Sequence, residues 1–339
     1  MTGWTVAIGV DTHKQWHVAV ALDRLGRQIE CLTAEATTVG YQRLLGWALE
    51  LGQPVFGIEG CGSYGAGLAA FLAERGFGVY ECERPKRGER RGGKNDLVDA
   101  TLAARRVVTG EGLSLPRGRG AREQLRVLLL ERRGAMRSRT AALNQLDAVI
   151  VTAPDDLRRR LDGVPKKQLV STAARLRPRS DGVTDVLGRI ARRAQALSAE
   201  ISEIDRSLLQ LVSDHAPTLL AECGVGAVCA AQLLVSSGDP ERMASEASFA
   251  ALAGTSPIDA SSGKHQRHRL NRGGDRQLNW ALHVIALQRV HHHAETATYY
   301  KRLLAAGKTT KEAKRCVKRA LARHFYQQLK QTQPLDLTT

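Results

Sequence analysis

Four carboxylate residues are the best candidates for chemistry in this sequence. Asp11 and Glu59 each end a short apolar run, and β-branched runs of this kind are typical of buried strands. Asp96 and Asp99 stand three residues apart at the start of a predicted helix, so they share one face of that helix. A buried charge is costly unless something pairs with it. We therefore expect these carboxylates to hold a positive partner.

Each carboxylate also has a simpler interpretation. An Asp at the position of Asp11 often caps the following turn. Asp96 and Asp99 lie in the first turn of their helix, where the helix dipole favours negative charge. As a set, however, carboxylates at strand ends completed by a helix can hold Mg²⁺, which keeps water and substrate phosphate in its shell. Two ions about 4 Å apart can act together in phosphodiester displacement.

The elements that would position these residues can be followed along the first hundred residues. An apolar strand ending at Asp11 is followed by strands at 17–23 and 28–33, which together predict a three-stranded antiparallel start. Helices and strands then alternate up to the helix that begins near Asp96. This order matches a ribonuclease H-like (RNase H-like) fold, which gathers carboxylates at neighbouring strand ends. The later elements are predicted at 41–51 (helix), 54–59 (strand), 66–75 (helix), 77–82 (strand) and 96–108 (helix).

Charge is distributed unevenly along the 339 residues. The chain carries a net charge of +16 and has a pI near 10.0. Residues 1–83 hold five Lys/Arg against nine Asp/Glu, a balance of −4, which leaves 45 basic and 25 acidic residues, or +20, for the remainder. An acidic first module joined to a basic remainder indicates a polyanionic partner, most simply nucleic acid. Charge that serves only solubility is the alternative.

Composition excludes several other classes. Hydrophobic residues make up 43% and charged residues 25%, the balance of a soluble globular protein with a core. The six cysteines show no C-x-x-C spacing, which argues against a zinc ribbon or a disulfide framework and for a reducing compartment. No signal peptide and no apolar run of membrane-spanning length is present, so a cytoplasmic protein without a membrane partner is expected.

Two long helices are predicted in the middle of the chain. The first spans residues 123–151 and carries an apolar stripe interrupted by Arg132 and Arg139. The second shows apolar residues at alternating steps of four and three from Val183 to Leu211, an a/d seam of about four heptads. We favour a coiled coil for this segment. Packing of the seam against the protein's own body is the alternative.

The basic residues and a glycine turn predict contacts with nucleic acid. Gly224 and Gly226 separate two helical segments and resemble a helix-hairpin-helix turn, whose backbone N–H groups can hold a phosphate. The basic side chains cluster in two further loops, and residues of this kind suit contacts with phosphates rather than bases. The candidates are Arg84, Lys86, Arg87, Arg90 and Arg91 in the first loop, and Lys264, Arg267, Arg269 and Arg272 in the second.

The motifs together resemble those of one family. GVDTHK at 9–14, EGCGSYG at 59–65 and RPKRGERRGGKNDLVDA at 84–100 look like the DEDD motifs of the IS110 insertion-sequence transposases, which include the Piv-type DNA invertases. In the second half, CGVGAVCAAQLL at 223–234 and ASSGKHQRHRLNRGGDRQLNWAL at 260–282 are similar to the same family. The resemblance covers nearly the whole chain in the right order.

This resemblance implies an α/β fold followed by an α-helical part. It implies an RNase H-like (RuvC-like) domain at 1–152, a linker and coiled coil at 153–213, and a mainly helical C-terminal transposase domain at 214–339. It also implies a serine nucleophile, for which Ser262, directly before Gly263, is preferred and Ser261 is the alternative. The implied acidic set, both metal-binding and catalytic, is Asp11, Glu59, Asp96 and Asp99.

The resemblance further implies an RNA-guided transposase or recombinase. Its cofactors would be Mg²⁺, two ions per site, and a structured non-coding (bridge) RNA; its other partners would be donor and target DNA and further copies of itself, as a dimer or tetramer. A second hypothesis is a RuvC-like junction nuclease that uses water and the four carboxylates, in which Ser262 is dispensable. A third is a nucleic-acid-binding scaffold without activity, which the intact acidic set argues against.

Overall fold

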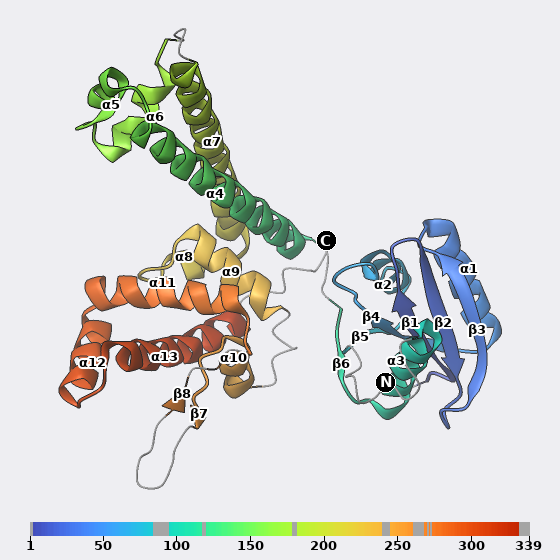
Figure 1. The fold of residues 1–339 in the computed structure, drawn as a ribbon. Coiled ribbons are helices and arrows are strands. Elements are labelled where there is room, and N and C mark those ends of the chain that lie inside the picture. Colours follow the sequence, from blue (N-terminus) through green and yellow to red (C-terminus); the bar gives the residue numbers. More distant parts are fainter. Residues whose placement is uncertain are drawn as a thin grey trace. The chain divides into compact units, whose positions relative to one another are not determined.

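A computed structural model of the chain describes residues 3–83, 95–116, 120–177, 182–238, 245–259, 268–269, 271 and 273–331. These residues form two compact units, Met1–Arg119 and Gly120–Thr339 (Figure 1). No helix within the described ranges has an apolar stretch long enough to cross a membrane.

The first unit is a mixed sheet with helices on both faces (Figure 1). The strand order is β3-β2-β1-β4-β5-β6. The first three strands are antiparallel, β4 and β5 continue parallel to β1, and β6 is antiparallel to β5. The helices and strands predicted from the sequence for this unit are confirmed, and β6 is an additional strand. The strands are β1 (Val6–Thr12), β2 (Trp16–Leu22), β3 (Gln28–Glu35), β4 (Pro54–Glu59), β5 (Val79–Cys82) and β6 (Leu113–Ser114), and the helices are α1 (Thr38–Glu50), α2 (Ala66–Ala73) and α3 (Asp96–Thr109).

The two faces of the sheet are covered differently. Alternate residues of β1, among them Ile8, pack in one cluster with Leu44 of α1 and Leu68 of α2. On the opposite face, Val20 of β2 packs against Ala104 of α3. Because side chains alternate along a strand, the odd-numbered residues of β1 face α3. This face is the one that carries the candidate carboxylates.

Two glycines allow α3 to lie very close to the sheet. Gly9 of β1 and Gly57 of β4 are direct neighbours in the parallel pairing. A Cβ atom at Gly9 would lie 2.0 Å from the Ala100 carbonyl oxygen and 2.2 Å from the Ala104 nitrogen. A Cβ atom at Gly57 would lie 2.4 Å from Val107 Cγ2. Side chains at these positions would push the helix, and with it Asp96 and Asp99, away from the strand ends.

Gly9→Ala is therefore expected to destabilise the first unit by about 3 kcal/mol or more, since the new methyl group meets helix backbone that cannot rotate aside. Thermal unfolding followed by tryptophan fluorescence measures the change. Gly46→Ala is the matched control, because a Cβ at this α1 position meets nothing within 4 Å and Ala favours a helix. Unfolding of Gly9→Ala at the wild-type temperature would contradict the close approach of α3.

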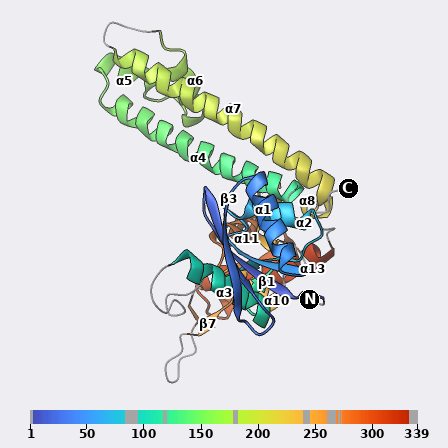
Figure 2. The same cartoon turned by 90° about the vertical axis from the view of Figure 1, so that its right-hand side faces the viewer.

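The second unit begins with two long helices that run side by side, as both views show (Figures 1 and 2). They are α4 (Ala121–Val151) and α7 (Val183–His215), joined at the far end by α5 (Asp155–Leu161) and α6 (Lys166–Ala174). Arg132 pairs with Asp205 at 2.5 Å, and Arg139 Nε donates to Ser198 Oγ at 2.7 Å. As the position on α4 rises, its partner's position on α7 falls, so the helices are antiparallel.

The apolar seam predicted at 183–211 is buried inside this hairpin. Ile204 and Leu208 of α7 belong to one core cluster with Leu125 and Leu129 of α4. The structure thus shows the alternative interpretation, in which the seam packs against other helices of the same chain. The two arginines that interrupt the stripe of α4 pair with polar residues of α7. Association of two chains through the same seam would first require α4 to leave it.

In its described residues, the rest of the second unit is helical apart from one short strand pair. Its helices share a large core with the ends of α4 and α7. The basic composition of residues 301–330 predicts a single helix, but the structure shows two helices, because the chain turns at Gly307, whose φ is +80°. The elements are α8 (Pro217–Leu220), α9 (Ala227–Ser237), α10 (Glu246–Leu252), β7 (Ile258–Asp259), β8 (His268–Arg269), α11 (Arg276–His292), α12 (Ala294–Ala305) and α13 (Thr310–Gln331).

The position of α4 bears on the predicted domain limits. The predicted domain 1–152 includes this helix, whereas the structure groups it with the second unit. The reason is its packing, which is against α7 and α9 along most of its length. As functional domains, the limits 1–152, 153–213 and 214–339 stay a prediction.

Candidate metal centre

Asp11 and Glu59 occupy neighbouring positions at the carboxyl ends of two parallel strands. Val10 of β1 is opposite Ile58 of β4, so the next residue of each strand is one of these carboxylates. Thr12 Oγ1 donates a hydrogen bond of 2.8 Å to the backbone carbonyl of Glu59, which ties the two strand ends together. Both carboxylate residues are buried, with 8% and 9% of their surface exposed.

Both residues lie on the sheet face that α3 covers. Asp11 is two residues beyond Gly9, and Glu59 is two residues beyond Gly57, so each shares the face of its glycine. The close approach of α3 at the glycines therefore brings the start of this helix to the strand ends.

The start of α3 supplies the other two carboxylates. Asn95 caps the helix, and its side-chain oxygen accepts a 3.0 Å hydrogen bond from the Leu97 N–H. This cap fixes the first turn, which contains Asp96 and Asp99. Asp99 is only 3% exposed, and its charge acts on Asp11, whereas the side chain of Asp96 is 41% exposed.

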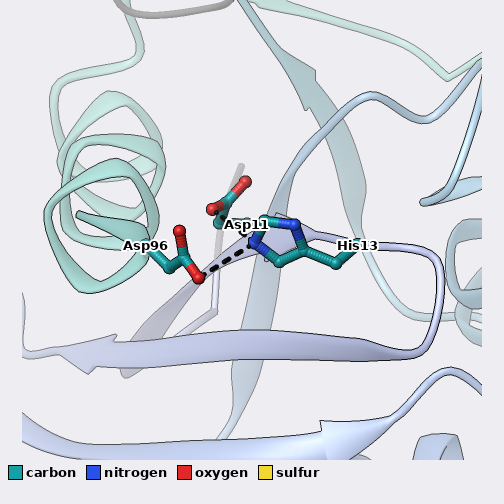
Figure 3. Close-up of side chains that lie close together, drawn as sticks. All are labelled: Asp11, His13 and Asp96. Atoms are coloured by element: carbon teal, nitrogen blue, oxygen red, sulfur yellow. Dashed lines mark ion pairs between the residues drawn. The ribbon is translucent and has the colours of Figure 1, made fainter. Parts of the chain in front are cut away.

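His13 lies between two of the carboxylates, as Figure 3 shows. Its Nε2 atom is 3.2 Å from Asp11 Oδ2 and 3.1 Å from Asp96 Oδ2. One potential ligand atom from each of these three residues lies within 4.8 Å of the others. Glu59 is at the adjoining strand end, outside this trio. The predicted residues Asp11, Asp96 and Asp99 are thus brought together, and His13 joins them.

The electrostatics of the site favour a bound cation. Burial raises the pKa of the Asp11 carboxyl; His13 opposes this shift, while the charges of Asp96 and Asp99 add to it. A raised pKa means that ionisation of this carboxyl is less favourable in the metal-free protein than it is in water. A divalent cation would relieve both the desolvation and the repulsion. Oxygen donors of this kind, partly open to solvent, fit Mg²⁺, which retains several water ligands.

The turn at 223–226 is held by packing in the second unit. Gly224 has a φ of +80°, and a Cβ there would lie 2.9 Å from Gln288 Cβ. Arg289 Nε donates to the Cys223 carbonyl at 2.8 Å and its guanidinium pairs with Glu222. Gly226 stands at the start of α9, with open space where a Cβ would be. Gly224 therefore has a packing role in the fold, and phosphate binding by this turn stays a prediction.

The two ends of the predicted serine loop are fixed to each other. A Cβ at Gly274 would lie 2.4 Å from the Gly254 nitrogen, so the backbones are in direct contact. Asn279 Nδ2 donates to the Ala253 carbonyl at 2.7 Å, and Lys318 Nζ donates to Asn279 Oδ1 at 2.8 Å. Between these ends, β7 and β8 pair as antiparallel strands. The structure thus provides a fixed base for the segment between the two strands.

Most of the other predicted site residues lie outside the described part of the chain. Arg269 is in β8, where its backbone pairs with Ile258. The residues outside the described ranges are Arg84, Lys86, Arg87, Arg90, Arg91, Ser261, Ser262, Lys264, Arg267 and Arg272.

Comparison with known proteins finds one family match for the segment that holds the acidic residues and another for part of the helical second unit. Residues 8–153 match a family model of DEDD-type transposases of the IS110 group, described as "Transposase", and this range contains all four acidic residues. Residues 217–301 match the model described as "Transposase IS116/IS110/IS902 family". The chain belongs to the IS110 family of transposases. The match to the DEDD model also implies an RNase H-like fold for the mixed sheet and a divalent metal for the acidic set.

One curated relative of this IS110-family chain comes from Streptomyces coelicolor. It is the "Insertion element IS110 uncharacterized 43.6 kDa protein", 33% identical over 132 residues. The aligned segment covers 38% of the present chain and 32% of the relative, so the chain spans about a third of the length of that protein.

Sequence reasoning missed three residues of this IS110-family chain that the structure places at the candidate sites. His13 follows Asp11 by two residues, a spacing that puts both on one side of an extended chain. That spacing was the available signal for His13. Asn279 and Lys318 secure the base of the serine loop from two different helices. Their juxtaposition depends on packing between α11 and α13 and has no local signature.

Proposed function

We propose that this protein is a DNA transposase, a recombinase that cleaves and rejoins DNA strands at donor and target sites. The observation that supports this most strongly is the meeting of Asp11, Asp96 and Asp99 at the ends of β1 and α3, in a chain matched by two transposase family models. Glu59 completes the proposed acidic set from the end of β4.

The acidic residues would bind and orient the metal. Two Mg²⁺ ions held there would stabilise the attacking and leaving oxygens of phosphodiester exchange. Asp11 and Glu59 are held rigidly by paired strands, and Asp96 and Asp99 by a capped helix turn. Such rigidity favours catalysis because the groups need little rearrangement when DNA binds.

Ser262 is the proposed nucleophile. Its Oγ would form a bond to the phosphorus of the cleaved linkage, the bond from phosphorus to the leaving strand oxygen would break, and the Oγ proton would pass to a base. The resulting phosphoserine ester conserves the bond energy that rejoining needs. The fixed base of the loop, formed by Gly254, Gly274 and Asn279, supports this proposal because a nucleophile must be held in place.

We also propose that the working form is a homo-oligomer, a dimer or tetramer, because recombination handles a donor and a target together. Since α4 covers the apolar seam of α7, contacts between subunits would use other surfaces. Mixing Asp11→Asn subunits with Ser262→Ala subunits tests this directly. Restored strand cleavage would show that different subunits supply the carboxylates and the serine.

Target choice is proposed to come from a bound RNA. The predicted basic contacts suit the phosphate backbone, which positions nucleic acid without reading its sequence. The residues after Glu83 carry a balance of +20, which favours salt-sensitive binding with little sequence preference. A recombinase needs a chosen site, and base pairing by a structured guide RNA can supply that choice.

The purified protein is accordingly expected to bind DNA with little sequence preference and to recombine it only with its cognate RNA. Changing the guide loops of that RNA should redirect the target, which sequencing of recombination products would reveal. Salt should weaken DNA binding by the RNA-free protein steeply. Site-specific recombination by protein shown to be free of RNA would overturn the guidance proposal and leave the metal and serine proposals standing.

A further inference from the structure

The ring of His13 lies directly between two of the carboxylates of the candidate metal centre. Its Nε2 atom is within 3.2 Å of one oxygen from each of Asp11 and Asp96. The side chain is 32% exposed, yet Nε2 itself is shielded from solvent. Nε2 also makes no hydrogen bond of acceptable geometry within the described part of the chain. The ring nitrogen is thus directed into the site without being aligned on either carboxylate.

The distances around Nε2 fit a shared metal ligand shell. In an octahedral site with bonds of about 2.1 Å, adjacent ligand atoms are about 3.0 Å apart. The separations of 3.2 Å to Asp11 Oδ2 and 3.1 Å to Asp96 Oδ2 are close to that value. An ion pair would give similar distances, but it is strongest when the N–H points at an oxygen. That alignment is missing here.

The backbone holds the imidazole in place without a metal. The His13 N–H donates a 3.0 Å hydrogen bond to the Trp16 carbonyl across the turn between β1 and β2. The His13 and Trp16 rings are also neighbours, with centroids 5.9 Å apart. Because Asp11 precedes His13 by two residues at the end of β1, both side chains extend to the same side of the chain. The ligand geometry is therefore largely preformed.

We propose that His13 Nε2 is a third protein ligand of the cation held between Asp11 and Asp96. This inference rests on the proposed metal centre and deepens it, because it adds a nitrogen donor to an oxygen site. Imidazole suits first-row transition metals, whereas Mg²⁺ prefers oxygen ligands. A site with this nitrogen donor should therefore favour Mn²⁺ over Mg²⁺ more strongly than a site made only of carboxylates.

The test uses the full-length protein with Mn²⁺ as the probe and no nucleic acid. Pulsed electron paramagnetic resonance detects a nitrogen bound directly to Mn²⁺, and ¹⁵N-labelled histidine identifies that nitrogen as imidazole. We expect a histidine coupling in the wild type that is lost in His13→Ala and His13→Gln. These variants should bind Mn²⁺ about tenfold or more weakly, with a smaller change for Mg²⁺. His215→Ala, which alters an exposed histidine of α7, is the control and should change neither result.

The outcomes separate this inference from the metal centre itself. If the wild type binds Mn²⁺ in a way that Asp11→Asn abolishes, but shows no nitrogen coupling, the metal centre stands and His13 is not a ligand. Tighter Mn²⁺ binding by His13→Ala would also overturn the inference, since His13 would then compete with the cation. If the wild type binds no Mn²⁺ at this site, both proposals fail. The labelled wild-type measurement needs no variant, so it holds even if His13→Ala folds poorly.

Discussion

Asp11→Asn is expected to lower DNA strand cleavage by about 10³-fold or more, because a lost ligand charge removes several kcal/mol of transition-state stabilisation. The side chain keeps its volume, so nucleic-acid binding should be nearly unchanged. Cleavage of labelled DNA in Mg²⁺ with the cognate RNA measures the effect. Glu74→Gln, which alters an exposed carboxylate of the same unit, is the control and should cleave like the wild type.

In the absence of metal, Asp11→Asn should be at least as stable as the wild type. Burial raises the pKa of Asp11, so its ionised form opposes folding, and this cost grows as the pH rises through that pKa. Asn removes the charge and with it the cost. Thermal unfolding in a chelator at neutral pH is expected to give an equal or higher midpoint. Full cleavage by Asp11→Asn in Mg²⁺ would remove this residue from the metal centre.

The other large effect is expected at Ser262. Ser262→Ala removes the proposed nucleophile and should lower formation of the covalent protein–DNA adduct on the order of 10⁴-fold or more. Binding of Mg²⁺, RNA and DNA should remain. The adduct is measured as DNA-linked protein on a denaturing gel, and mass spectrometry of the digested adduct locates the modified residue.

Ser261→Ala is the matched control for this prediction, because it changes the same side chain one residue earlier. It should still form the adduct. If Ser261→Ala is the inactive variant and Ser262→Ala is not, the nucleophile is Ser261. If both variants cleave normally and the products are free ends, water is the nucleophile and the junction-nuclease alternative is correct.

Much of the first unit could be predicted from the sequence because its strands have a strong local signal. β1 and β4 are short apolar runs, with Asp11 as the second-last residue of β1 and Glu59 as the last residue of β4. Parallel neighbours place their carboxyl ends together, so the position of Asp11 and Glu59 at neighbouring strand ends follows from the strand order. The Asn95 cap and the acidic first turn likewise locate the start of α3.

Other features depend on contacts between distant segments. The periodicity of α7 shows that its apolar side needs a partner, but α4 as that partner follows only from the folded chain. The close approach of α3 to Gly9 and Gly57 was missed for the same reason. His13 acquires its position from the turn between β1 and β2, whose geometry is not evident from the types of the neighbouring residues.

We propose that the acidic cluster of β1, β4 and α3 holds the metal that contacts DNA. Anomalous diffraction at the manganese edge, from crystals of the protein with its RNA, DNA and Mn²⁺, would locate that metal. The prediction is a peak in contact with the carboxylates of Asp11 and Asp96 and with a phosphate of the cleaved strand. A well-ordered cleavage site that lies elsewhere, with no ion at these carboxylates, would contradict it.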